Sequence, residues 1–163
     1  MTERIVKAEL LKKIIAQLSH DLDVLFTAAK TAHEASTHEE NQPDNKYDTL
    51  ALEASYVAQG QANRAHELRK SIEIYRQLKP HGSNVETVRL TSLVTLEDPD
   101  GKQRTLFICP IEGGLKIEYQ DQEIVVITPG SPLGRELLGK TVGDAVEIET
   151  GNSRTEYEIV EIC

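Results

Sequence analysis

The sequence predicts an α+β protein in which a long antiparallel coiled-coil hairpin precedes a small, mostly antiparallel β-sheet domain with one short helix. Three observations lead to this fold class. A heptad pattern runs through the first half, the apolar spacing changes to every second residue in the second half, and turn-forming residues stand between the segments. The expected domains are residues 1–79 for the hairpin, 80–86 for a linker and 87–163 for the sheet domain.

Two heptad seams predict the hairpin. The first consists of Leu11, Ile15, Leu18, Leu22, Leu25, Ala29 and Ala32, which alternate intervals of four and three residues. The second consists of Leu50, Ala54, Val57, Gln61, Ala65, Leu68, Ile72 and Tyr75, with one polar position. Each helix is expected to span about 30 residues, or about 45 Å at 1.5 Å per residue.

An acidic stretch separates the seams. Residues 38–48 read HEENQPDNKYD and hold four acidic side chains and one basic side chain. Pro43 and its Asn and Asp neighbours favour a turn, so the stretch is expected at the far end of the hairpin. A block of charge this small is usually a solvated loop, and charge alone assigns it no function.

The second half predicts five strands and one helix. The strands are expected at residues 88–96, 105–111, 123–128, 145–150 and 156–162, with a tight turn at 98–101. The helix is expected within residues 131–139, because Ser131 can cap it, Pro132 suits its first turn and Gly139 can end it. The apolar surroundings of Cys109 indicate a core residue rather than a reactive thiol.

Composition excludes several classes of function. The net charge of −9 disfavours simple electrostatic binding to nucleic acid, and residues 81–163 carry most of it, with 15 acidic and 7 basic side chains. The chain has few aromatic side chains for base stacking or for an aromatic ligand pocket, with two Phe, five Tyr and no Trp. No apolar run approaches the ~20 residues of a membrane span, and a cytoplasmic protein with no membrane contact is expected.

A family resemblance is carried by the second half of the chain. Residues 131–140, SPLGRELLGK, followed by VGD at 142–144 and VEI at 146–148, closely resemble the C-terminal signature of the GreA/GreB transcript cleavage factors. The strand VTL at 94–96, the turn at 98–101 and YEI at 157–159 match as well. The first half resembles the family in architecture and length more than in amino-acid sequence.

The resemblance implies an FKBP-like sheet domain that docks on the rim of the secondary channel of bacterial RNA polymerase. The coiled coil would pass down the channel, where its tip carboxylates help to hold a second Mg²⁺ and position water for cleavage of backtracked RNA. The polymerase would supply the catalytic site, so the factor is not expected to be an enzyme or to bind a cofactor tightly. It would meet the RNA 3′ end indirectly, as a monomer.

The resemblance also implies site residues. Family tips carry an Asp and a Glu three residues apart, the latter followed by Asn; here Asp44 precedes Asn45, whereas Asn41 occupies the strict position of the first acid. Glu40 and Asp44 are therefore expected to serve catalysis and hold the metal, with Glu39 as a substitute for Glu40.

For polymerase contact, the signature implies the exposed side of its helix, with Ser131, Pro132, Leu133 and Arg135 as contact residues. A purely structural interpretation stands beside it, in which these residues cap, start and pack the short helix.

Three other functions remain open. A paralogue could occupy the same channel and modulate transcription without stimulating cleavage. Peptidyl-prolyl isomerase activity would need an aromatic-lined pocket, for which Phe26 and Phe107 are the only phenylalanines. A coiled-coil adaptor with no polymerase contact would leave the signature of residues 131–140 unexplained.

Overall fold

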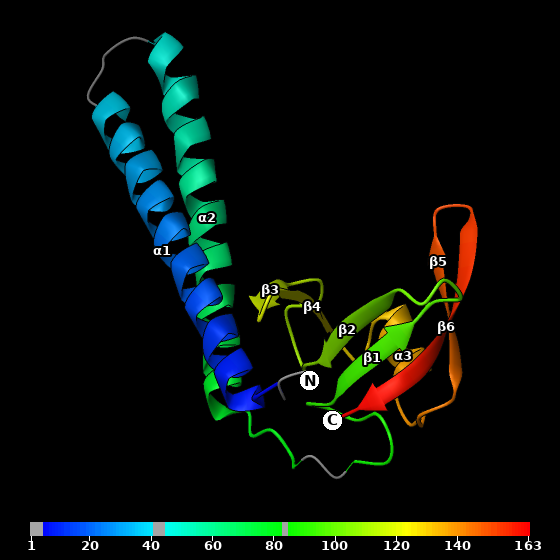
Figure 1. Cartoon of the computed structure of the whole chain (residues 1–163). Helices are drawn as coiled ribbons and strands as arrows, with labels where there is room; N and C mark the ends of the chain where they lie inside the picture. The colour runs from blue at the N-terminus through cyan, green and yellow to red at the C-terminus, as the bar shows by residue number, and fades with distance from the viewer. Residues whose placement is uncertain (1–4, 41–44, 83–84) are drawn as a thin grey trace. The chain divides into compact units, whose positions relative to one another are not determined.

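The computed structural model describes residues 5–40, 45–82 and 85–163, which form two compact units (Figure 1). One unit is Leu11–Leu78, and the other combines the chain up to Leu10 with Lys79–Cys163. The fold class expected from the sequence, a helical hairpin with a sheet domain that carries one short helix, is confirmed. None of the helices in the described part of the chain is long and apolar enough to cross a membrane.

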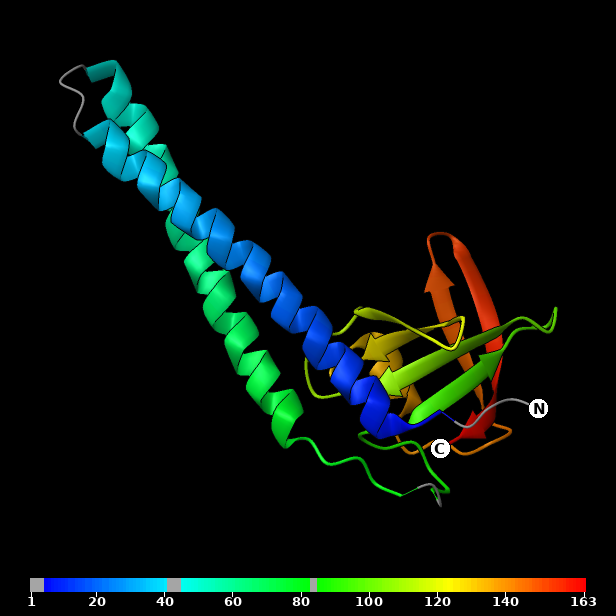
Figure 2. The ribbon, with the colours of Figure 1, turned by 60° about the vertical axis from the view of Figure 1, so that its left-hand side comes forward.

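The hairpin consists of α1 (Lys7–Glu40) and α2 (Asn45–Gln77), which lie side by side and antiparallel in both views of the ribbon (Figures 1 and 2). At 1.5 Å per residue, the 34 residues of α1 span about 51 Å. Because only residues 41–44 separate the helices, Glu40 and Asn45 lie at the same end of the hairpin.

The helices meet along a wider face than the predicted seam of α1. On α2 the predicted residues Ala65, Leu68, Ile72 and Tyr75 are all buried. On α1, Ile14 is buried as completely as Leu18, and Ile15 is only half-buried. A helix that packs with three or four of every seven positions buries such a neighbour of the seam, whereas a strict coiled coil uses two.

The sheet has six strands in the order β3-β4-β2-β1-β6-β5. Their bounds are β1 Leu93–Glu97, β2 Gln103–Ile108, β3 Lys116–Tyr119, β4 Gln122–Ile127, β5 Ala145–Thr150 and β6 Ser153–Ile162. Neighbouring strands are antiparallel except β2 and β4, which pair in parallel, with Thr105 beside Ile124. The sheet is therefore mixed, because β3 takes the edge and β4 returns between it and β2.

The sequence placed the start of the first strand wrongly and missed one strand. The first strand begins at Leu93 instead of Val88, because Thr91 has a φ of 67° and interrupts the extended backbone. Val88 instead receives a hydrogen bond from Gly139 N–H at 2.9 Å. Strand β3 was not predicted, since its turn is formed by Gln120 and Asp121, whose positive φ angles usually call for Gly or Asn.

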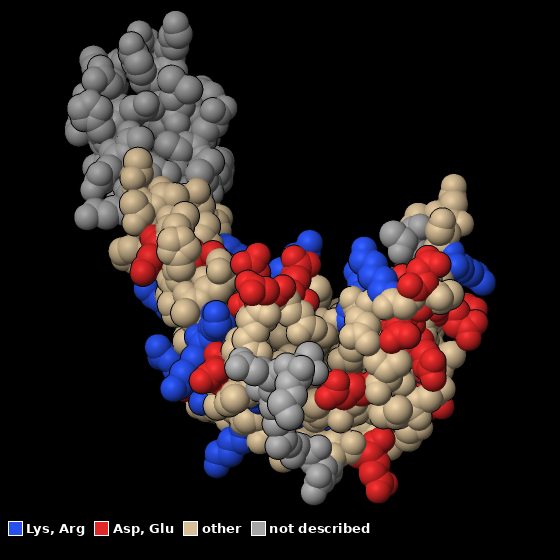
Figure 3. Space-filling model, viewed as in Figure 1, with Lys and Arg blue, Asp and Glu red and all other residues tan. Residues whose placement is uncertain are grey.

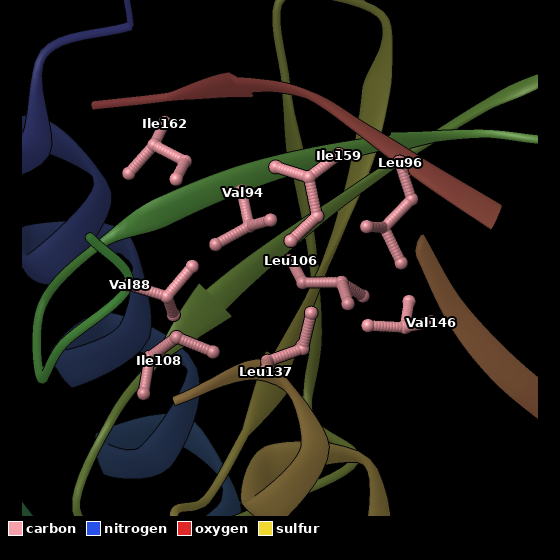
Figure 4. Packing of buried hydrophobic residues seen from close by; sticks show 9 residues of the cluster. All are labelled: Val88, Val94, Leu96, Leu106, Ile108, Leu137, Val146, Ile159 and Ile162. Atoms are coloured by element: carbon pink, nitrogen blue, oxygen red, sulfur yellow. The ribbon is translucent and has the colours of Figure 1, made fainter. Parts of the chain in front are cut away.

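A buried cluster lies between one face of the sheet and the short helix α3 (Pro132–Leu137) (Figure 4). Leu137 of α3 is fully buried and points toward Leu106 and Ile108 of β2. The other members are Val88, Val94, Leu96, Val146, Ile159 and Ile162. Cys109 is also fully buried, as its apolar surroundings predicted.

The first turn of α1 is attached to the sheet domain by polar contacts. The Tyr119 hydroxyl donates a hydrogen bond to Glu9 at 2.7 Å, and the Lys7 ammonium donates to the backbone oxygen of Cys163 at 2.8 Å. Val6 N–H donates more weakly to the Tyr119 hydroxyl, at 3.4 Å. These bonds explain why the chain up to Leu10 groups with the sheet domain.

Candidate functional site

The predicted metal-binding tip lies where the two helices of the hairpin turn. Glu40 is the last residue of α1, and its side chain, like that of Glu39, lies outside those that the structure describes. Asp44 and Asn41 fall outside the described residues altogether. The structure thus brings the backbone of Glu40 and of Asn45 to one end of the hairpin, and the roles of Glu40 and Asp44 stay predictions.

The donor chemistry of the tip suits part of a magnesium site. Mg²⁺ prefers six oxygen ligands and keeps several waters, so it is commonly bound through one or two carboxylates plus phosphate oxygens. Glu40 and Asp44 would supply two such carboxylates. Among the residues with described side chains, no group of three His, Cys, Asp or Glu could hold a metal ion.

The predicted polymerase-contact residues surround the start of α3. Ser131 Oγ accepts a hydrogen bond from Gly134 N–H at 3.0 Å and donates one to the Thr128 carbonyl at 2.8 Å. Pro132 occupies the first turn, and Gly139 follows the helix with a φ of 83°. The structural interpretation of Ser131, Pro132 and Gly139 is therefore confirmed, and contact with a polymerase stays a prediction.

Gly134 permits a close approach between this helix and the preceding strand connection. A β-carbon at this position would lie 2.0 Å from the Thr128 carbonyl oxygen and 2.9 Å from Ser131 Oγ. That carbonyl also accepts the Ser131 N–H, at 3.1 Å. A glycine is thus needed for the loop to fold against α3 while Ser131 caps it.

Removal of the Ser131 cap is expected to weaken the sheet domain. Ser131→Ala leaves Gly134 N–H without its acceptor, so the free energy of unfolding should fall by about 1 kcal/mol. Ser131→Thr keeps the hydroxyl and should stay within a few tenths of wild type. Urea titration followed by circular dichroism measures both variants, and an alanine variant as stable as the threonine variant would contradict the role of the cap.

Two hollows lie between α3 and β5, next to the exposed residues of the signature at 131–140. One, of about 470 Å³, is lined by Pro132, Leu133, Glu136, Glu147, Ile148 and Glu149. The other, of about 410 Å³, is lined by Arg135, Glu136, Leu138, Lys140, Ala145, Val146 and Glu147. Of the lining residues, only Pro132, Leu133 and Arg135 were predicted from the sequence as contact residues. Those of β5 were missed because the motif VEI at 146–148 predicted only a strand.

Hydrogen bonds stabilise the turn that connects α3 to β5, the two elements that line the hollows. Asp144 accepts hydrogen bonds from Thr141 N–H at 2.8 Å and from Thr141 Oγ1 at 3.2 Å. The backbone bond in particular favours the ionised carboxylate and lowers the pKa of Asp144. The VGD part of the signature therefore has a structural role in starting β5.

Comparison with protein families finds one match in the sheet domain. Residues 83–163 match the model for the C-terminal part of the transcription elongation factors GreA and GreB. This range contains the residues that line both hollows.

Comparison with individual proteins finds relatives of two kinds. The chain is 30% identical over 134 residues to transcription elongation factor GreA of Thermomicrobium roseum, covering 82% of this chain and 80% of that one. It is 26% identical over 153 residues to transcription inhibitor protein Gfh1 of Thermus thermophilus, covering 93% and 91%. The crystal structure of Thermus aquaticus Gfh1 is 25% identical and covers 95% of this chain and 92% of that one, with a TM-score of 0.39.

Proposed function

This chain belongs to the GreA/GreB family of transcription elongation factors, and on that premise we propose that it enters the secondary channel of bacterial RNA polymerase and stimulates cleavage of backtracked RNA. The observation that supports this function is the hairpin, which brings Glu40 and Asn45, the neighbour of Asp44, to one end of two long helices. The sheet domain would dock on the channel rim through Ser131, Pro132, Leu133 and Arg135.

The hairpin has the dimensions for delivering side chains into a narrow channel. Each α-helix is about 10–12 Å wide with its side chains, so a pair reaches about 51 Å while staying slender. Burial of Ile14 and Leu18 on α1 and of Leu68 and Ile72 on α2 stiffens the part of the hairpin away from the tip. A single exposed helix would lack this packing and would position its end less well.

Glu40 and Asp44 would hold a Mg²⁺ ion together with groups of the polymerase. When bound, the ion stabilises the charge on the attacking and leaving oxygens of phosphodiester cleavage. Two carboxylates supply fewer oxygens than Mg²⁺ requires, so the free factor is expected to bind it weakly and to act as an accessory protein. The polymerase would provide the other ligands and the catalytic site.

A second function is favoured by a specific observation. Relatives named transcription inhibitor protein Gfh1 match over 93% of this chain. The first tip acid also departs from the family spacing, because Asn41 stands where that acid is expected. The second candidate is therefore a factor that occupies the same channel and slows transcription without accelerating cleavage.

A transcript-cleavage assay on halted elongation complexes tests both functions. With purified bacterial polymerase, the factor is expected to accelerate shortening of the RNA by at least ~10-fold over intrinsic cleavage, which needs only ~1.4 kcal/mol of barrier reduction. Binding with slower elongation and unchanged cleavage would support the inhibitor function. Failure to bind the polymerase would contradict both.

A further inference from the structure

The buried seam of the hairpin is interrupted on α2 at Gln61. The seam residues that follow it are 5% exposed or less, and they are Ala65, Leu68, Ile72 and Tyr75. Gln61 occupies the preceding seam position and is only half-buried. The intervals from Val57 to Gln61 and from Gln61 to Ala65 are both four residues, whereas a heptad seam alternates four and three. The extra residue disturbs the winding that keeps the seam against α1, so we expect weaker packing at this point.

The side chain of Gln61 also brings an unpaired polar atom into the seam. Its Oε1 atom is buried, and among the described residues it has no hydrogen-bond partner. A buried acceptor without a partner has lost the hydrogen bonds that water would give it, which disfavours the closed seam. Separation of the helices at this residue restores contact with water. The seam is therefore expected to open more easily here than at its apolar positions.

The facing part of α1 is packed less tightly than the part nearer its start. Ile14 and Leu18 are fully buried, whereas Leu22 and Leu25 are only half-buried. Because α1 ends at Glu40 and α2 begins at Asn45, Leu25 lies at about the same level of the antiparallel hairpin as Gln61. Both helices thus lose burial at the same level.

Gly60 weakens the backbone of α2 beside the unpaired atom. It is exposed, and a β-carbon there would meet nothing within 4 Å, so packing does not require a glycine. Glycine within a helix lowers its stability relative to alanine, because the unfolded backbone gains more freedom. The helix and the seam are therefore weakened at adjacent residues.

The described contacts outside the seam add little cohesion between the helices at this level. The Arg69 guanidinium lies 5.9 Å from the centre of the Phe26 ring, but Phe26 is 55% exposed, so the cation–π contact is weak. The ion pair between Arg64 and Glu67 at 3.3 Å lies within α2 alone. Figure 3 shows charged side chains of both signs on the outer surface of the hairpin, where water and salt screen them.

We propose that Gly60 and Gln61 form a joint at which the hairpin opens locally while its base stays packed. The base consists of residues 11–18 of α1 and 65–77 of α2, which hold the fully buried part of the seam. Opening at the joint lets the end of the hairpin that carries Glu40 change direction without unfolding of the base. The joint is a property of the hairpin itself and does not depend on the polymerase.

Hydrogen exchange of backbone amides in the free, full-length protein tests the joint. In wild type, residues 60–62 are expected to be protected at least ~10-fold less than residues 68–72, because local opening exposes them. Gln61→Leu removes the unpaired acceptor and fills the seam, so protection of residues 60–62 should rise at least ~10-fold. Gly60→Ala strengthens only the helix and should raise it by up to ~5-fold.

The control Gln59→Leu makes the same chemical change at an exposed neighbour outside the seam. Protection of residues 60–62 should then stay within ~3-fold of wild type. An equal rise in both leucine variants would show that the seam position of Gln61 does not govern the opening. Wild-type protection at 60–62 as high as at 68–72 would show that there is no joint.

A reciprocal variant moves the weak point into the base. Leu68→Gln places a polar side chain at a fully buried seam position, so protection of residues 65–72 should fall at least ~10-fold. Unchanged protection there would contradict the claim that a polar seam residue determines where the hairpin opens. Amides of β1 and β2 serve as the reference in every variant, since their protection shows that the sheet domain remains folded.

Discussion

The double variant Glu40→Ala, Asp44→Ala is expected to lose the stimulation of RNA cleavage while binding polymerase as tightly as wild type. Removal of both carboxylates withdraws the oxygen ligands that the tip would contribute to Mg²⁺. Metal stabilisation of the reacting oxygens amounts to several kcal/mol, so the stimulated cleavage rate should fall at least ~100-fold. Binding should persist because the contacts of the sheet domain are unchanged.

The assay for this variant needs a control on the same helix. Asp23→Ala removes an exposed carboxylate of α1 far along the chain from the tip and should leave cleavage and binding unchanged. The single variants Glu39→Ala and Glu40→Ala decide which residue acts as the first acid. Normal cleavage by the Glu40, Asp44 double variant would show that the assignment of the tip is wrong.

Gly134→Ala is expected to destabilise the sheet domain strongly, against the usual preference for alanine within a helix. The new β-carbon would lie 2.0 Å from the Thr128 carbonyl oxygen, a backbone atom that cannot rotate away. Relief of the overlap requires movement of the loop or of α3, which would also disturb the Ser131 cap. The free energy of unfolding should fall by about 3 kcal/mol or more.

Gly60→Ala provides the matched comparison. Gly60 lies exposed within α2, and a β-carbon there would meet nothing within 4 Å. Alanine should therefore stabilise this helix by up to about 1 kcal/mol. Hydrogen exchange of amides in β1 and β2 reports on the sheet domain directly, and unchanged protection in Gly134→Ala would contradict the close approach.

The features that sequence analysis predicted are those determined by local spacing. The seam residues of α2 from Ala65 to Tyr75 are buried, and α3 begins and ends at its expected cap and glycine. In both cases a few neighbouring residues carry the signal. Cys109 was predicted correctly for the same reason, because its neighbours are apolar.

The features that were missed depend on residues far apart in the sequence. The parallel pairing of β2 with β4 depends on β3, whose turn at Gln120 and Asp121 lacks the usual glycine. The β5 side of the hollows was overlooked because Glu147 and Glu136 come to line the same hollows only after the chain has turned at Asp144. A sequence resemblance can identify residues within one helix, but the residues that two elements contribute to one surface are identified only once the fold is known.

The attachment of Val6, Lys7 and Glu9 to the sheet domain bears on how the protein is made. The domain is assembled from two stretches of chain, and the whole of Leu11–Leu78 is inserted between them. On the ribosome, the hairpin can form from local contacts as it emerges, whereas the sheet must wait for β6 before β1 gains both neighbours. If the inserted helices fold early, they hold Leu10 and Lys79 near one another. The entropy cost of bringing the chain up to Leu10 back to the rest of the sheet domain is then lower.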